Sequence, residues 1–94
     1  MPLRRKEISA NEKDFLKRVL GRDDLGFDFI KSILKDLKKA QARIITLHYG
    51  LINQRKYSFE EIASLLGISL NRVMKIESKA LDQIRGSIFL KAKQ

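Results

Sequence analysis

A chain of 94 residues fits one domain and is too short to bury a deep catalytic cleft. Its composition, 44% hydrophobic with five Gly and one Pro, excludes a disordered segment and disfavours an all-β domain, so helices are expected. Lys and Arg number 20 against 11 Asp and Glu, and the resulting net charge of +9 favours nucleic acid as a polyanionic partner. The chain has no Cys, which excludes disulfides, Cys-based zinc sites and thiol nucleophiles.

The sequence carries no signal for a membrane, for export or for a cofactor. The longest apolar stretch lies around Ile44–Ile52, is interrupted by polar residues and Gly50, and is far shorter than a bilayer span. The basic start Met1–Lys6 is not followed by an apolar signal core. We therefore expect a soluble cytoplasmic chain with no membrane partner, no small-molecule substrate and no cofactor.

Three helices are predicted in the first half of the chain. Asn11–Leu20 has apolar residues at helical spacing and is followed by Gly21, a stop signal. Phe27–Lys38 repeats apolar residues at i, i+3, i+4 and i+7, with lysines on the opposite face. Ala40–Tyr49 ends before Gly50, which stands where a left-handed C-terminal cap belongs.

Two more helices are predicted in the second half, joined by a tight turn. After a basic loop over Leu51–Tyr57, Ser58 and Glu61 form the pattern of a capping box for a helix over Phe59–Leu66. Gly67-Ile68-Ser69 breaks this helix, and a long one follows. The inward side of the long helix is predicted to consist of Val73, Ile76, Ala80, Leu81, Ile84 and Ile88.

The turn between these two helices has the pattern of a helix-turn-helix. That motif needs a small residue where the helices cross, a Gly with positive φ in the turn, and apolar residues that hold the second helix. Ala63 is the small residue, Gly67 the turn, and Ile68 the plug of the corner. The inward anchors are Ile62, Leu66, Val73 and Ile76. An ordinary αα-hairpin would also place Gly between two amphipathic helices, but the basic charge favours the DNA-binding type.

The predicted fold class is all-α, a small domain of about five helices with a C-terminal helix-turn-helix. Residues 1–25 are expected to form an N-terminal helix or extension, and residues 26–94 the helix-turn-helix domain. The two parts are expected to pack as a single compact unit.

In this register the N-terminal, outward face of the last helix would enter the major groove of DNA. Asn71 can pair with adenine and Lys75 with guanine, while Leu70 and Met74 offer apolar contact, for instance to thymine methyl groups. The candidate base contacts are Ser69 (also the N-cap), Leu70, Asn71, Met74 and Lys75, with Ser78 at the margin. The candidate phosphate contacts are Arg55, Lys56, Arg72, Lys79 and Arg85, although each could equally be a solvated surface charge.

Other residues have a structural interpretation that outweighs a functional one. His48 is the only histidine, and we expect it to pack rather than to bind a metal. Glu60 and Glu61 have no nucleophile or second base beside them, so no enzymatic activity is expected. Aromatic residues at helical spacing are usually core, and the expected exceptions are the two chain ends, because so small a core does not cover both. The aromatic residues concerned are Phe15, Phe27, Phe29 and Phe89, and the expected exposed exceptions are Phe15-Leu16 and Ile88-Phe89-Leu90.

The chain resembles a known family along the helix-turn-helix and the helix before it. The matching residues are Leu47-His48-Tyr49-Gly50-Leu51, Tyr57-Ser58-Phe59-Glu60-Glu61-Ile62-Ala63, Leu66-Gly67-Ile68-Ser69, Arg72-Val73, Ile76-Glu77, Ala80-Leu81 and Arg85. This pattern is similar to region 4, the fourth domain of housekeeping-type bacterial RNA polymerase sigma factors, from about Lys31 to Arg85.

The resemblance implies a bacterial, nucleoid-associated protein with two main partners. Ser58–Arg85 would enter the major groove of the upstream (−35) element of double-stranded promoter DNA. Lys31–Leu51 would grip the β flap of core RNA polymerase, and the candidate flap contacts are Ile33, Leu37, Ile44, Leu47 and Leu51. The resemblance also implies an activator, which would meet Lys79, or an anti-sigma protein.

The reading positions depart from the family pattern. Where the family shows Arg and Glu just after the turn and Arg and Gln one turn later, the chain has Leu70, Asn71, Met74 and Lys75. Two other hypotheses therefore stay open: a sigma-like interaction module that binds polymerase or a regulator without standard promoter readout, and a repressor-like protein independent of polymerase, which would need a dimer. The sequence also lacks the sigma segments that melt the −10 region, so it is expected to be an excised domain or a small sigma-like accessory protein.

Overall fold

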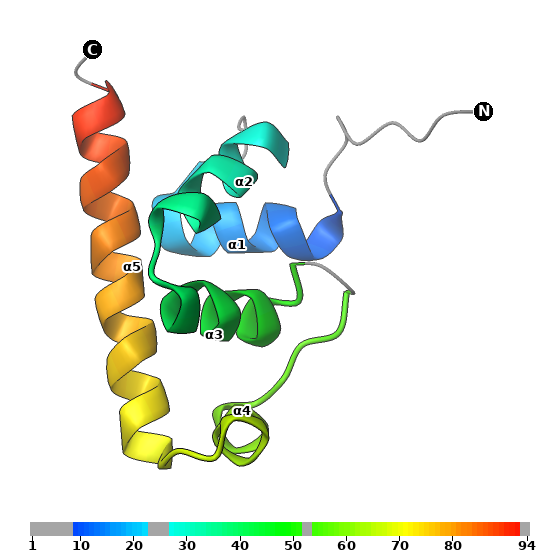
Figure 1. The fold of residues 1–94 in the computed structure, drawn as a ribbon. Coiled ribbons are helices and arrows are strands. Elements are labelled where there is room, and N and C mark those ends of the chain that lie inside the picture. Colours follow the sequence, from blue (N-terminus) through cyan, green and yellow to red (C-terminus); the bar gives the residue numbers. More distant parts are fainter. Residues whose placement is uncertain (1–8, 23–26, 52–53, 93–94) are drawn as a thin grey trace.

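The computed structural model describes residues 9–22, 27–51 and 54–92, except for the side chains of residues 27 and 87–92. These residues form five helices and no strand, which confirms the all-α prediction: α1 (Ala10–Leu20), α2 (Phe27–Asp36), α3 (Lys39–Tyr49), α4 (Phe59–Leu66) and α5 (Leu70–Ala92). In Figure 1, α1, α2 and α3 lie beside the long α5, and α4 lies below α3 at the foot of α5. None of the described helices has the length and apolar character that crossing a membrane requires.

The predicted helix ends are confirmed where side chains or glycines mark them. The hydroxyl of Ser58 accepts from the backbone N–H of Glu61 at 3.1 Å, and the Glu61 carboxylate accepts from the backbone N–H of Ser58 at 2.9 Å. Gly50 ends α3 and Gly67 ends α4, each with positive φ, at 64° and 69°. These ends fix the length of the helices on both sides of the turn.

The second helix is shorter than predicted, because α2 stops at Asp36 and not at Lys38. Lys38 has an extended backbone and is the N-cap residue of α3. Its N–H donates to the side chain of Gln41 at 3.0 Å, and this bond belongs to the start of the next helix. Periodicity alone could not show this change of role, since Leu37 and Lys38 continue the amphipathic pattern of α2.

A cluster of buried side chains joins α1, α2, α3 and α5. Phe15 and Leu16 are fully buried in it, so the expectation that they form an exposed exception was wrong. The ring of Phe15 meets that of Tyr49 edge to face, with centroids 5.0 Å apart. The expectations for the side chains of Phe27, Ile88, Phe89 and Leu90 lie outside the described residues.

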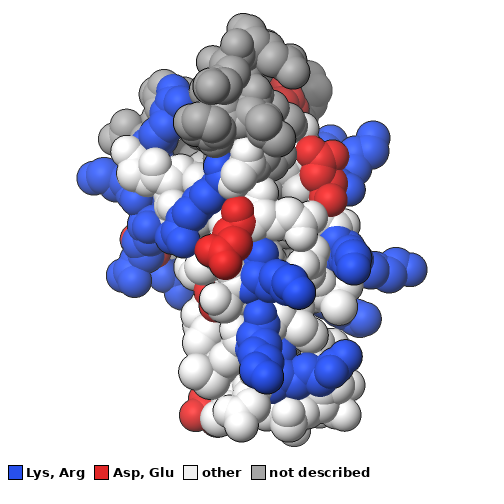
Figure 2. All heavy atoms as spheres, turned by 90° about the vertical axis from the view of Figure 1, so that its left-hand side faces the viewer, with Lys and Arg blue, Asp and Glu red and all other residues white. Residues whose placement is uncertain are grey.

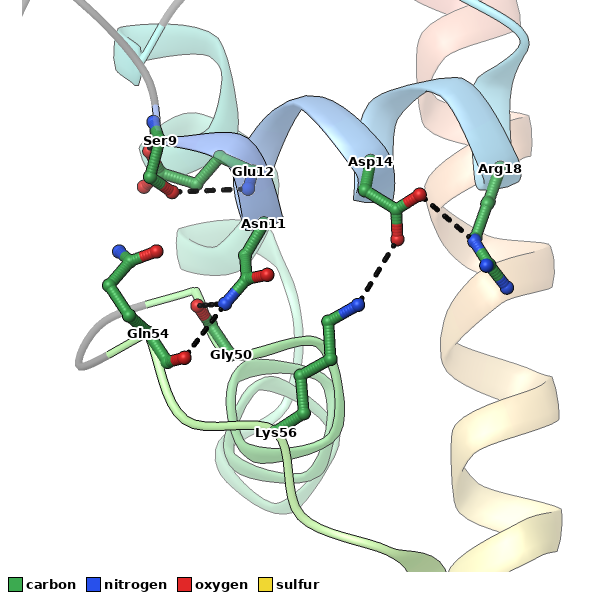
Figure 3. A network of polar contacts seen from close by, with 8 residues as sticks. All are labelled: Ser9, Asn11, Glu12, Asp14, Arg18, Gly50, Gln54 and Lys56. Carbon is green, nitrogen blue, oxygen red and sulfur yellow. Dashed lines mark hydrogen bonds and ion pairs between the residues drawn. The ribbon is translucent and has the colours of Figure 1, made fainter.

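Polar contacts fasten α1 to the loop that follows α3 (Figure 3). The side-chain amide of Asn11 donates to the carbonyl of Gly50 at 3.3 Å and to that of Gln54 at 2.9 Å. Asp14, one turn further along α1, pairs with Lys56 at 3.4 Å and with Arg18 at 3.0 Å. The loop that leads to α4 is therefore held against α1.

Candidate nucleic-acid interface

A second buried cluster builds the predicted helix-turn-helix. Ile62 of α4 and Val73 of α5 are fully buried together with Ile44 of α3. The residues packed around them are Leu47, Tyr57, Phe59, Ala63, Leu66, Ile68 and Ile76. The backbone N–H of Ile68 donates to the carbonyl of Ala63 at 3.1 Å and closes the turn. The register predicted for the crossing, the turn and the inward anchors is therefore confirmed.

The beginning of α5 is capped as predicted. The hydroxyl of Ser69 accepts from the backbone N–H of Arg72 at 3.1 Å, and the backbone carbonyl of Ser69 accepts from the N–H of Val73 at 3.1 Å. This cap fixes where the first turn of α5 begins, and so which side chains point away from Val73.

All six predicted base-contacting side chains are exposed at this end of α5. They are Ser69, Leu70, Asn71, Met74, Lys75 and Ser78. Leu70 is 38% exposed and Met74 45%, whereas Val73 between them is fully buried. The fold thus presents the predicted reading face to the outside, and the contact with bases stays a prediction.

Arg72 lies beside a groove that adds two basic residues to the predicted set. The groove has a volume of about 400 Å³, an apolar floor and a basic rim. Its lining residues are Lys39, Ala40, Arg43, Leu66, Ile68, Arg72 and Ile76. Sequence reasoning missed Lys39 and Arg43; the signal for them was their spacing of four residues, which places both on one face at the start of α3.

The other predicted phosphate contacts are spread over the molecule. Arg55 pairs with Glu61 at 3.7 Å and lies over the ring of Tyr57, 4.6 Å from its centroid. Lys56 pairs with Asp14 on α1, as described above, and Lys79 is exposed on α5. Such exposed ion pairs are weak because solvent and salt screen them, so these cations can exchange their partners for phosphates.

Arg85 has a structural contact of its own. Its Nε donates to the carbonyl of Val19 at 2.9 Å and ties α5 to the end of α1. Arg85 follows Leu70 by fifteen positions in the same helix, a distance of about 22 Å along the axis. The structure thus brings Arg72 to the reading end of α5 and leaves Arg85 beside α1.

Figure 2 shows the charged side chains on the face of the molecule where α5 lies. Lys and Arg side chains cover much more of this face than Asp and Glu do. This distribution agrees with the net charge of +9 and suits a polyanion.

Aromatic contacts hold α3 against α4 and α5. The Nδ1 of His48 lies 2.9 Å from the carbonyl oxygen of Tyr57, which can only accept, so Nδ1 carries the hydrogen. The His48 ring also stacks on Phe59 with centroids 4.0 Å apart, which confirms its packing role. The hydroxyl of Tyr49 donates to Glu77 at 3.0 Å. Burial, and then the charge of Glu77, raise the pKa of Tyr49 above its usual value, so the hydroxyl keeps this hydrogen.

The predicted flap contacts divide into buried and accessible residues. Ile33, Ile44 and Leu51 are at most 2% exposed and serve the two buried clusters. Leu37 and Leu47 pack against these clusters but remain partly exposed. In this conformation only Leu37 and Leu47 can touch a partner directly, and the flap contact stays a prediction.

Within the ranges that the structure describes, no three His, Cys, Asp or Glu side chains gather as a metal site would need.

Comparison with known proteins points to one family. A family model described as Sigma-70, region 4 matches residues 33–86. The RNA polymerase sigma-C factor of Nostoc sp. is 36% identical over 69 residues, which cover 73% of this chain and 16% of that protein. The sigma factor SigA1 of Synechococcus elongatus is 32% identical over 73 residues, 78% of this chain and 17% of that protein. The probable sigma-C factor of Synechocystis sp. is 29% identical over 85 residues, 90% of this chain and 20% of that protein. The chain therefore spans about a sixth to a fifth of the length of these curated relatives.

Proposed function

Because the chain belongs to the sigma-70 region 4 family, a non-enzymatic one, we propose that it binds promoter DNA with α4 and α5 as its helix-turn-helix. The first turns of α5 lie in the major groove at the −35 element. The single observation that carries this proposal is the capped start of α5, where Val73 is anchored in the core while Asn71 and Lys75 on the opposite side are exposed.

Phosphate contacts flank this reading face and set its position on the duplex. Arg72 reaches the DNA backbone on one side, with Lys39 and Arg43 of α3 across the groove. Lys79, Arg55 and Lys56 supply further contacts along α5 and the loop before α4. These contacts give affinity without sequence preference, since phosphates are the same at every base pair.

The second partner in this proposal is core RNA polymerase, with its β flap on α2 and α3. The support is the family, the relatives that are RNA polymerase sigma factors, and the partly exposed side chains of Leu37 and Leu47. The chain then acts in the bacterial cytoplasm at the nucleoid, where an activator or anti-sigma protein can meet it at Lys79.

One observation favours a second candidate function, a sigma-like module that binds polymerase or a regulator without reading the standard promoter. Leu70 and Met74 occupy reading positions and cannot form the hydrogen bonds of a charged or amide reader. A protein surface could cover them instead.

The test is a pull-down of the chain with bacterial core RNA polymerase, followed by footprinting on promoter DNA with and without polymerase. The wild-type chain is expected to bind polymerase and to protect the −35 region, and Asn71→Ala with Lys75→Ala is expected to lose that protection. Lys17→Ala, an equal loss of charge on the exposed face of α1, is the matched control and should keep it. A chain that binds neither polymerase nor DNA refutes the proposal. Polymerase binding with protection unchanged in the Asn71 and Lys75 variants favours the second candidate.

A further inference from the structure

Two large apolar side chains lie exposed at the reading end of α5. Leu70 is 38% and Met74 45% exposed, and the third such residue in the described part of the chain is Leu65 on α4, at 60%. A single exposed Leu is ordinary and needs no explanation. Here two of the three fall on adjacent turns of one helix, at the place where a helix-turn-helix meets base edges.

The core of the protein does not use these two side chains. Val73, Ala80 and Ile84 form the buried side of α5, and Leu70 and Met74 belong to neither buried cluster. Their spacing of four residues places them on one side of the helix, about 6 Å apart along its axis. Asn71 and Lys75, each one residue further, lie exposed beside them. The outward surface at this end therefore consists of an apolar pair beside a polar pair.

The major groove offers one apolar group to such a pair, the C5 methyl of thymine. Over a C·G pair the same side chains would cover hydrogen-bonding edges that they cannot satisfy, which is unfavourable. Asn71 suits the adenine of A·T pairs, so the polar neighbour fits the same base pairs. Lys75 lies beside the apolar pair, and Arg72 and Lys79 lie further round α5. These exposed cations favour a duplex over an apolar protein surface.

We propose that Leu70 and Met74 read thymine methyl groups, so that the chain selects A·T base pairs at these two positions of its DNA site. The proposal rests on the proposed function, DNA binding by α5, and adds the kind of base pair that is selected. It also explains how reading positions without the usual charged residues can keep sequence preference.

The experiment replaces thymine by uracil, which removes only the methyl group and leaves the hydrogen-bonding edge intact. A duplex is first selected from a random library by the full chain, alone and bound to bacterial core RNA polymerase. Affinity is then measured for the selected duplex with deoxyuridine at single thymine positions. We expect binding to weaken about fourfold for each contacted methyl that is lost.

Variants assign the effect to its side chains. Leu70→Ala and Met74→Ala should each bind the thymine and uracil forms equally well at one position, because the partner of that methyl is gone. Leu65→Ala removes the same kind of exposed apolar side chain from α4 and should keep the full difference. Unchanged helicity of each variant, measured by circular dichroism, shows that these exposed substitutions preserve the fold.

The outcomes separate this inference from the proposed function. If the wild-type chain binds its selected duplex equally well with uracil at every position, the methyl inference is wrong and DNA binding stands. If no duplex is selected, either alone or with polymerase, the proposed function fails and the inference with it. If Leu70→Ala and Met74→Ala weaken polymerase binding but leave the thymine preference intact, a protein covers these side chains and the inference is also overturned.

Discussion

Gly50 caps the C-terminal end of α3, at a position where a side chain would have an unfavourable backbone conformation and too little room. Its φ of 64° lies in the left-handed region, and a Cβ atom there would stand 2.7 Å from Nδ2 of Asn11 and 3.1 Å from the carbonyl oxygen of Arg55. Gly67 has nearly the same backbone, with φ of 69°, but no atom within 4 Å of the position of a Cβ. Gly86 lies inside α5 without a positive φ and has open space around it.

These three glycines form a graded series of alanine substitutions. Gly67→Ala should cost about 1 kcal/mol of unfolding free energy, from the left-handed backbone alone. Gly50→Ala should cost more, since the contact between α1 and the loop must also shift. Gly86→Ala should leave stability unchanged or raise it by up to about 1 kcal/mol, because Ala favours helix over Gly. Urea denaturation measures all three, and equal losses at Gly50 and Gly67 would refute the steric part of the argument.

The capping box of α4 predicts a dependence on pH. A backbone hydrogen bond from Ser58 lowers the pKa of Glu61 below its ordinary 4.5. A carboxyl whose pKa is lower in the folded state stabilises the fold above its unfolded pKa, and this contribution is lost as pH falls through the folded pKa. The stability gap between the wild-type chain and Glu61→Gln should therefore be fully present at neutral pH and shrink below about pH 4.5.

Denaturant unfolding from pH 7 to pH 3 measures this gap. Glu60→Gln is the matched control, because it removes the same charge one residue away and outside the capping box. The hydrogen bond from Arg18 also lowers the pKa of Asp14. The stability of the wild-type chain therefore also depends on the titration of Asp14 at acid pH, and this dependence cancels when the Glu61→Gln stability is subtracted. A gap that stays constant down to pH 3 would contradict the assignment.

At the scale of elements, α1 shares a core with the helices of the family match, which begins only at residue 33. Phe15 and Leu16 are fully buried, and Arg85 bonds the end of α1 from the far part of α5. We therefore propose that the segments 1–25 and 26–94 unfold as one unit.

Phe15→Ala tests this coupling. It should lower the free energy of unfolding by about 3–5 kcal/mol, as expected for the loss of a buried aromatic ring. Far-UV circular dichroism reports all helices, while the fluorescence of Tyr49 and Tyr57 reports α3 and the loop before α4. Both signals should shift together in the variant, and Leu65→Ala, at an exposed site, should shift neither. Two separate transitions would mean that α1 is an independent extension.

The success of sequence reasoning on these elements depended on how local each signal is. Three local signals mark helix ends: the capping box at Ser58 for the start of α4, Gly50 for the end of α3 and Gly67 for the end of α4. Each signal lies within four residues of the helix end that it marks, and each of these ends was predicted correctly. The burial of Phe15 could not be predicted this way, because Tyr49 covers it from 34 residues further along the chain. Helical spacing identifies an apolar face but not its partner.

At the scale of the whole molecule, folding gathers charges that are scattered in the sequence. Lys39 and Arg43 stand about thirty residues before Arg72, yet all three line one groove. The net charge indicated a polyanionic partner, and only the packing of α3 against α5 shows where that charge collects. The predicted base-contacting positions at the start of α5 could be identified without knowing how the helices pack, because they follow one another along a single helix.

The basic groove makes a prediction about salt. Each phosphate contact releases bound counterions, so log affinity should fall steeply and linearly with log salt concentration. Arg72→Ala should make this slope shallower by about one unit, and Lys39→Ala or Arg43→Ala should do the same if the DNA backbone enters the groove between them. Lys17→Ala removes an equal charge from α1, away from the groove, and should leave the slope nearly unchanged. These slopes are obtained by measuring DNA affinity across a series of salt concentrations. An affinity independent of salt would contradict phosphate binding altogether. A change of slope for Arg72→Ala alone would mean that the DNA backbone contacts only the α5 side of the groove.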